Sequence, residues 1–339
     1  MSTGVIFPAH PEQILKGLSK LWTEMGHEEK GQGQPTVLRA CAMTLIVATN
    51  EADDGYTASQ TISELMKDNP SRGIVLKVSD EGEHDLEARV LAQCWKPFGK
   101  AQQICCELVE ITARPSSWPN VGPTLVGLVA ADLPVIFWCR HCGALGRNAT
   151  ADEKAGLAAI VNLSHKVIFD SQVLAPADAI AMIDKWQKQR KVVADLEWTR
   201  LTPWREPLCH AFSNETRHNN FSQFRSLEIE HTEEKPSLSA LYMAAWLSNP
   251  NKATVTFRQV KGFGPGLHRV ILRSENETIE FGRNSAECAT LSSTVGRSRR
   301  YNFGELSLTT LMTEELSVAG TDPVFNSVIP RVKELAGTN

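Results

Sequence analysis

The stretch Cys139-Arg140-His141-Cys142 is the part of the sequence whose residue types and spacing best suit chemistry. Two thiols separated by two residues are typical of redox-active pairs, and neighbouring cationic groups lower the pKa of an exposed thiol. Zinc requires four ligands, and the sequence holds no second CxxC or HxxxH pair. We therefore expect no bound metal, and two interpretations stay open: a regulatory dithiol formed by Cys139 and Cys142, or a loop of reduced thiols.

The eight cysteines are scattered along the chain. A chain of this length does not need disulfides for a stable core, so we expect most of the thiols to be reduced and buried. Cys105 and Cys106 are adjacent, and adjacent side chains of a strand point to opposite faces of the sheet. One of the two is therefore expected in the core.

Asp170 and Ser171 follow the apolar run 166–169 in the same way that Cys139 follows the apolar run 134–138. Ligands of α/β proteins bind outside the carboxyl ends of parallel strands. One interpretation is therefore a crevice near Cys139 and Asp170 that binds a sugar phosphate, in an enzyme or a sensor. The alternative is that Asp170 ends a strand and caps the segment that follows.

A run of three arginines, Arg297, Arg299 and Arg300, offers a second concentration of charge near the end of the chain. Arginine binds phosphates and carboxylates through a planar fork of donors. The run is therefore a candidate for contact with an acidic partner surface. The alternative is a solvated surface loop, which contributes little to binding or to stability.

The stretch 195–206 concentrates two tryptophans and two arginines around a proline. Trp198, Arg200, Trp204 and Arg205 are of the residue types that dominate protein interfaces, because each ring offers a large apolar area and each guanidinium several donors. The alternative is that the two tryptophans hold two domains together. Both interpretations stay open, and both can hold at once.

Motifs for common cofactors are absent from the sequence. The glycine cluster 262–266 contains a proline and precedes a strand-like segment, whereas a dinucleotide fingerprint requires a helix there. We interpret it as a hairpin turn. The chain also lacks a GxxxxGK[ST] loop, a GxSxG elbow and an HExxH helix. We therefore expect no catalytic centre and no cofactor.

Composition narrows the classes of partner. The 339 residues are 42% apolar, which is enough for a large core, and the formal net charge is −4. Nucleic acids and anionic membranes demand a positive field that this chain does not provide. Neither a signal peptide nor a membrane-spanning stretch is recognisable. We expect a cytoplasmic protein whose partner is another protein or a metabolite.

The hydrophobic pattern predicts an α/β N-terminal domain with a mixed, largely parallel sheet. Helices are expected over 14–22, 62–66, 125–131, 151–161 and from Pro176, and strands over 37–49, 73–78, 86–95, 103–112, 134–138 and 166–170. The strand–helix–strand order at the start predicts a parallel pair. The two strands over 86–112 have no helix between them, which favours an antiparallel part.

An α+β C-terminal domain is expected after this. A helix is predicted over 237–247 and strands over 253–260, 267–274 and 277–283. Asp322 and Pro323 are typical of a helix start, followed by an apolar stripe that includes Val324. The expected divisions are a helix and linker over 1–35, the α/β domain over 36–192 and the α+β domain over 193–339.

With these residues in view, the sequence resembles the OpcA family of glucose-6-phosphate dehydrogenase assembly proteins. The resemblance covers about residues 36–335 and rests on RACAMTLIVAT, NPSRGIVL, QQICCELVEITAR, AADLPVIFWCR, EELSVAGTDPVFNSVIPRV and, most specifically, DLEWTRLTPWRE. It implies a two-part, non-catalytic protein of the oxidative pentose phosphate pathway. Such a protein binds glucose-6-phosphate dehydrogenase and promotes its assembly, or activates it allosterically. Cys139 departs from the family pattern, which has tryptophan there, so the resemblance assigns no role to the CRHC loop.

Overall fold

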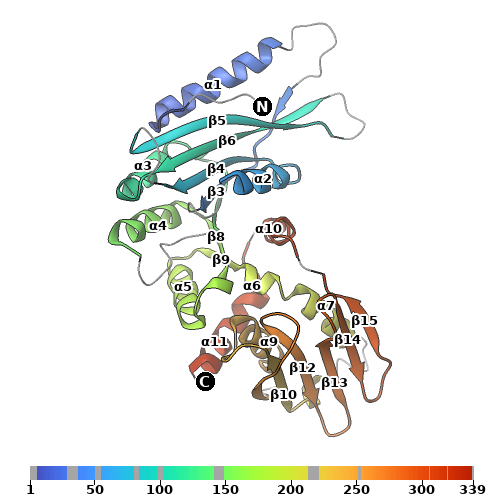
Figure 1. Ribbon diagram of the computed structural model, residues 1–339. Helices are drawn as coiled ribbons and strands as arrows, with labels where there is room; N and C mark the ends of the chain where they lie inside the picture. Colours follow the sequence, from blue (N-terminus) through green and yellow to red (C-terminus); the bar gives the residue numbers. More distant parts are fainter. Residues whose placement is uncertain are drawn as a thin grey trace. The chain divides into compact units, whose positions relative to one another are not determined.

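The chain forms two compact units, each built around its own β-sheet (Figure 1). The first unit comprises residues 1–169 and 186–193, and the second unit residues 170–185 and 194–339. The computed structural model describes residues 6–28, 37–49, 55–79, 84–97, 102–140, 149–212, 221–250, 253–304, 306–318 and 320–337. Each unit is therefore described by itself.

The sheet of the first unit is mixed and largely parallel, as the sequence predicts. Its order is β1-β5-β6-β4-β3-β7-β8-β9, and β2 also pairs with β6. β3 is parallel to β4 and β7, whereas β5 runs antiparallel to β1 and β6. The strands are β1 (Phe7–Pro8), β2 (Val37–Arg39), β3 (Met43–Thr49), β4 (Ser71–Val78), β5 (Leu86–Trp95), β6 (Gln103–Ala113), β7 (Val135–Cys139), β8 (Lys166–Phe169) and β9 (Val192–Asp195).

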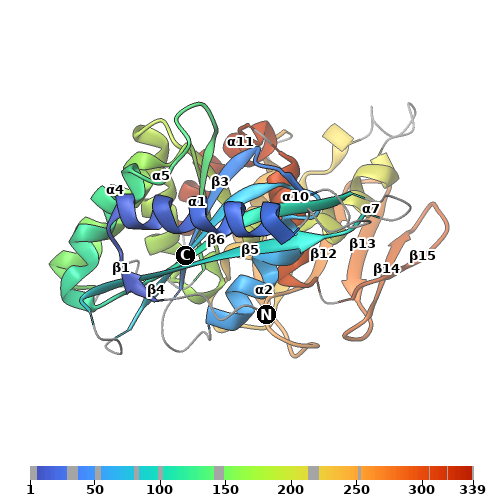
Figure 2. The same cartoon turned by 90° about the horizontal axis from the view of Figure 1, so that it is seen from above.

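Helices cover this sheet, and Figure 2 shows α1 lying over β5 and β6. The helix predicted over 14–22 is confirmed and is longer. A capping box formed by Thr150 and Glu153 begins α4. The helices of this unit are α1 (Pro11–Glu28), α2 (Gly55–Leu65), η1 (Pro115–Asn120), α3 (Val121–Val126) and α4 (Ala151–Leu163).

The helix predicted over 125–131 is wrong in its position, because α3 begins at Val121 and ends before Gly127. Pro123 fits there, since a proline near the start of a helix replaces an amide that lacks an intrahelical acceptor. A β-carbon at Gly127 would lie 2.6 Å from Cβ of Pro11. The segment therefore packs closely against the start of α1.

The second unit contains a six-stranded sheet in the order β11-β10-β12-β13-β14-β15. β10 and β11 are parallel, and the other pairs are antiparallel. The predicted strands are confirmed as β11 (Thr254–Gln259), β12 (Leu267–Arg273) and β13 (Thr278–Arg283), whereas the sequence did not predict β10 (Ser226–His231), β14 (Cys288–Ser293) and β15 (Arg299–Asn302). The hairpin turn expected over 262–266 is wrong, because β10 lies between β11 and β12.

Helix α9 (Leu238–Ser248) is buried along most of its length and packs on β10 and against α11 (Pro323–Gly337). The carboxylate of Asp322 accepts the amides of Val324 and Phe325 at 2.8 and 3.0 Å, which confirms it as the N-cap. Val324 itself is exposed and does not belong to the buried stripe. The other helices are η3 (Ser171–Val173), α5 (Pro176–Lys188), α6 (Leu196–Thr199), α7 (Thr202–Phe212), η4 (Phe221–Gln223) and α10 (Leu308–Ser317).

None of the helices within the described ranges is both long enough and apolar enough to span a membrane.

Candidate functional site

A buried carboxylate organises the beginning of the DLEWTRLTPWRE stretch. Asp195 is the N-cap of α6 and is fully buried. Its carboxylate accepts the amides of Ser171 and Glu197 at 3.0 and 3.1 Å and the hydroxyl of Tyr242 at 2.7 Å. Burial raises the pKa of Asp195 to about 7, although these hydrogen bonds favour the charged form. Asp195 therefore joins η3, α6 and α9 in one network.

Arg200 lies next to this network and is held by two carboxylates. Its Nη1 donates to Oδ1 of Asp170 at 2.8 Å and to Oε2 of Glu197 at 3.0 Å. Asp170 also accepts the amide of Gln172 and caps η3, so the capping interpretation is confirmed. Burial is the main cause that raises the pKa of Glu197. Arg200 is thus engaged within the second unit.

Both tryptophans of the stretch lie in the core of the second unit. Trp198 is 2% exposed and Trp204 is 3% exposed. Nε1 of Trp198 donates to Asp322 at 2.9 Å, and its ring lies near those of Tyr242 and Phe325. The ring of Trp204 lies 5.1 Å from that of Phe281 and 4.8 Å from that of Phe303. Neither indole is exposed to a partner in this structure.

Arg205 packs against the ring of Trp198. Its guanidinium lies 4.0 Å from the centre of the Trp198 ring, and Nη2 donates to the hydroxyl of Thr202 at 2.9 Å. Burial lowers the pKa of Arg205. Arg205 therefore packs onto the aromatic core through a cation–π contact.

The arginine edge, which we define as Arg297, Arg299 and Arg300, lies in contrast on the surface. Arg299 and Arg300 belong to β15, at the end of the sheet, so the loop interpretation is wrong for them. All three side chains are exposed. Arg297 and Arg299 line a depression of about 230 Å³ with Tyr301. Arg300 is expected on the opposite face, because side chains alternate along a strand.

The second unit contains a cavity with a volume of about 760 Å³. Its walls come from the segment after β8, from α6, from the segment that joins β10 to α9, from residues 265–267, and from β13 and the end of α11. Arg200 and Trp204 of the stretch reach it. A volume of this size suits a small metabolite. Sequence reasoning missed the cavity, because its walls come from distant segments.

The CRHC stretch is only partly described. Cys139 ends β7, is 1% exposed and takes part in a disulfide. The reduced-thiol interpretation is therefore wrong for Cys139. His141 and Cys142 lie outside the described residues. Cys139 and Asp170, near which the sequence predicts a crevice, belong to different units. Asp170 forms an ion pair with Arg200. The crevice stays a prediction.

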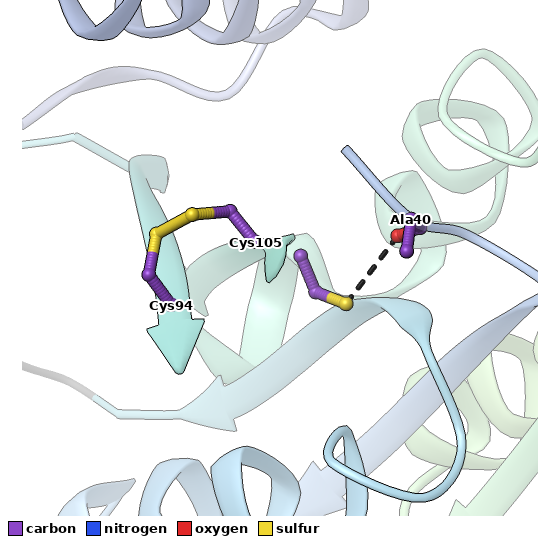
Figure 3. Close-up of a disulfide and its surroundings, with 4 residues drawn as sticks. Ala40, Cys94 and Cys105 are labelled. Atoms are coloured by element: carbon purple, nitrogen blue, oxygen red, sulfur yellow. Dashed lines mark hydrogen bonds between the residues drawn. A yellow bond between two sulfur atoms is a disulfide. The ribbon is translucent and has the colours of Figure 1, made fainter. Parts of the chain in front are cut away.

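The expectation of mostly reduced thiols also fails at a second place. A disulfide joins Cys94 of β5 to Cys105 of β6 (Figure 3). The two residues face each other in the antiparallel pair, which brings their Cα atoms to 4.1 Å. Cys106 on the opposite face is buried, and its thiol donates to the carbonyl of Ala40 at 3.3 Å. Burial raises the pKa of Cys106 to about 11, which disfavours the thiolate form that reacts as a nucleophile.

No group of three or more histidine, cysteine, aspartate or glutamate side chains that could hold a metal ion occurs in the part of the chain that the structure describes.

Comparison with known families gives two matches that together cover most of the chain. Residues 62–187 match the N-terminal domain of the family described as glucose-6-phosphate dehydrogenase subunit. Residues 191–329 match the C-terminal domain of the same family. Along the chain, the match to the N-terminal domain precedes the match to the C-terminal domain.

Curated relatives carry the name OxPP cycle protein OpcA. The protein from Synechococcus elongatus is 26% identical over 236 residues, which are 68% of this chain and 50% of that protein. The protein from Nostoc punctiforme is 26% identical over 194 residues, or 55% of this chain and 39% of that protein. The chain thus spans half or less of the length of these relatives.

Solved structures give weaker similarities. An oxidoreductase from Sinorhizobium meliloti has a TM-score of 0.47 at 8% identity, covering 88% of this chain and 96% of that chain. An inositol dehydrogenase homologue from Azotobacter vinelandii, complexed with NADH and myo-inositol, has a TM-score of 0.35 at 8% identity, covering 90% and 88%. These similarities carry no conclusion about activity.

Proposed function

Because the chain belongs to the glucose-6-phosphate dehydrogenase subunit family, we propose that it is a non-catalytic partner of glucose-6-phosphate dehydrogenase. In this role it acts as an assembly factor or an allosteric activator in the oxidative pentose phosphate pathway. The observation that carries the proposal is the match of both family domains over 62–187 and 191–329. The names of the curated relatives support a role in this pathway.

The glycine cluster supports a non-catalytic role. Residues 262–266 join β11 to β12, and a strand follows the cluster. Dinucleotide pyrophosphates bind instead where a glycine-rich turn leads into the N-terminus of a helix. This cluster therefore lacks the geometry for binding NADP, and catalysis stays with the dehydrogenase.

An activator of this kind needs only to bind one state of the dehydrogenase more tightly than another. The equilibrium between the states then shifts by the ratio of the two affinities. Typical coupling energies of about 1–3 kcal/mol correspond to roughly 5–150-fold changes in affinity. Assembly and activation then become two outcomes of one binding event.

We further propose the arginine edge as the contact surface on this chain. Its three guanidinium groups are exposed, and β15 ends the sheet. Arginine is enriched at interfaces because it offers several donors and a planar face. The alternative is that these charges only prevent edge-to-edge pairing of the sheet. The two tryptophans are less suited to contact, since they are buried.

Co-purification with the dehydrogenase from the same cell, followed by activity assays with and without this chain, tests the proposal. We expect association and a rise in dehydrogenase activity or in its assembled fraction. The chain alone is expected to reduce no NADP and to bind it no more tightly than about 1 mM. Oxidation of glucose 6-phosphate by the chain alone would contradict the non-catalytic role.

A further inference from the structure

The 760 Å³ cavity of the second unit contains polar groups that the protein itself leaves unpaired. Nε of Arg283 and Oε2 of Glu233 are buried and have no hydrogen-bond partner among the described residues. Both residues line this cavity. An unpaired buried donor or acceptor costs free energy. The lining therefore offers a cationic donor and an anionic acceptor to a molecule that enters the cavity.

Arg283 is held in place by its other contacts. Its guanidinium lies 5.3 Å from the centre of the Phe303 ring, and Nη1 donates to the carbonyl of Phe263 at 3.3 Å. These contacts fix the direction of the guanidinium fork before a ligand arrives. A fixed fork loses less entropy when it binds an anion.

Two further features make this end of the cavity attractive to an anion. The exposed Lys235 lines the wall just before α9. Ser237 caps α9 through the amide of Ala240, and the first intrahelical bond comes from the amide of Leu241. The N-terminus of this 11-residue helix therefore contributes partial positive charge where it meets the cavity.

The other charges of the wall are already engaged. Glu197 pairs with Arg200 at 3.0 Å, and Arg200 also pairs with Asp170. The charges that form no ion pair with another wall residue are the cations Lys235 and Arg283 and the carboxylate of Glu233, whose charge also acts on His231. Two cations favour a phosphate, and the buried Oε2 of Glu233, which no described group donates to, favours a hydroxyl group.

We propose that this cavity binds a phosphorylated, polyhydroxylated metabolite of the sugar phosphate class. The phosphate lies between Arg283, Lys235 and the start of α9, and a ligand hydroxyl donates to Glu233. The volume of about 760 Å³ falls within the range of metabolite sites. The inference goes beyond the association with the dehydrogenase and does not depend on it, because binding is measured on this chain alone.

Calorimetric titration of the full chain with glucose 6-phosphate, glucose and inorganic phosphate tests the inference. We expect glucose 6-phosphate to bind with a dissociation constant below about 1 mM, and at least about tenfold more tightly than glucose or phosphate alone. No heat of binding from glucose 6-phosphate at roughly 10 mM would overturn the inference.

Three variants separate the parts of the ligand. Lys235→Ala and Arg283→Lys should each weaken the binding of glucose 6-phosphate about tenfold. Lys235→Ala removes a charge-assisted hydrogen bond, and Arg283→Lys replaces the planar fork and its unpaired Nε donor with a single ammonium group. Glu233→Gln should weaken glucose 6-phosphate but not inorganic phosphate, because it affects only the hydroxyl. Lys261→Ala removes an exposed charge that does not line the cavity and should change nothing. Equal affinities for glucose 6-phosphate in all four folded variants would overturn the inference.

Discussion

The tryptophan stretch and the arginine edge share their residue types with protein interfaces, but the second unit places them in opposite environments. Trp198 and Trp204 are 2% and 3% exposed, whereas the three arginines of the edge lie on the surface. Tryptophan and arginine are enriched in interfaces because they combine apolar area with hydrogen-bond donors. The same combination also suits a hydrophobic core in which polar side chains pair with the buried donors. Residue type therefore indicates how much free energy a contact can contribute, but not whether the contact is made inside the chain or with another protein.

The position of each region in the chain explains the difference. The stretch begins at the buried cap Asp195 and meets rings from α9, α11 and β13. β15 lies at the end of the sheet, and one side of its backbone has no neighbouring strand among the described residues. The burial of each region thus follows from the topology, which places the tryptophan stretch against three other elements and the arginine edge at the end of the sheet.

The largest expected effect is a loss of stability in the tryptophan stretch. Trp204→Ala should lower the free energy of unfolding by about 3–5 kcal/mol, because it leaves a cavity beside Phe281 and Phe303. Denaturant titration measures this effect. Phe263→Ala, which truncates an aromatic side chain that is 46% exposed, is the control and should cost less than about 1 kcal/mol. Equal losses in both variants would break the contrast.

A pH dependence should sharpen the contrast, because the tryptophan stretch begins at the buried carboxyl group of Asp195, which can gain or lose a proton. The pKa of Asp195 in the folded protein is about 7, above its ordinary value of 3.8. Between these values the folded state holds a proton that the unfolded state releases. The stabilising contribution of this proton is full below about pH 4 and is lost as the pH rises through about 7.

Asp195→Asn isolates this effect. The variant keeps an acceptor for the amides of Ser171 and Glu197 but does not ionise. The free energy of unfolding of the wild type should fall, relative to the variant, by up to about 1.4 kcal/mol per pH unit between pH 4 and 7. Denaturant titrations of both proteins across this range measure the difference. Parallel profiles would show that Asp195 ionises normally.

The smallest effect on stability is expected at the arginine edge. Replacing Arg297, Arg299 and Arg300 together with glutamate should change the free energy of unfolding by less than about 1 kcal/mol, because the side chains are exposed. Association with glucose-6-phosphate dehydrogenase should weaken at least about tenfold, as at other charged interfaces. Thermal melts and binding titrations on one preparation measure both quantities.

A control of equal charge change comes from the first unit. Lys16→Glu, Lys20→Glu and Lys67→Glu together reverse three exposed lysines. This variant should bind the dehydrogenase as the wild type does. Equal weakening by both triple variants would mean that net charge, rather than the arginine edge, governs association.

The sequence predicts the first sheet well and the second less well. Runs such as MTLIVAT are apolar throughout, which is typical of buried parallel strands, and β3 appears where expected. β14 and β15 have the sequences CATLSS and RRYN. Their polar residues leave too few apolar positions for the sequence pattern to indicate strands at the edge of an antiparallel sheet. A local pattern detects burial on both faces of a strand more readily than a half-exposed strand at an edge.

The candidate site was predicted only in part. The cap at Asp322 and the role of Asp170 follow from local rules. The disulfide between Cys94 and Cys105 depends on the register between two strands, and the cavity depends on which distant segments meet. The burial of Trp198 likewise depends on Tyr242 and Phe325, which are far away in the sequence. Such long-range pairings are not encoded in spacing along the chain.

The most direct test of the account measures glucose-6-phosphate dehydrogenase activity and assembly size together, with the chain absent, present, or carrying the three arginine-to-glutamate substitutions. The account predicts that the wild-type chain raises activity or the assembled fraction, that the substituted chain does so only at about tenfold higher concentration, and that neither chain reduces NADP alone. A dehydrogenase whose activity and size are unchanged by a saturating amount of the folded wild-type chain would contradict it.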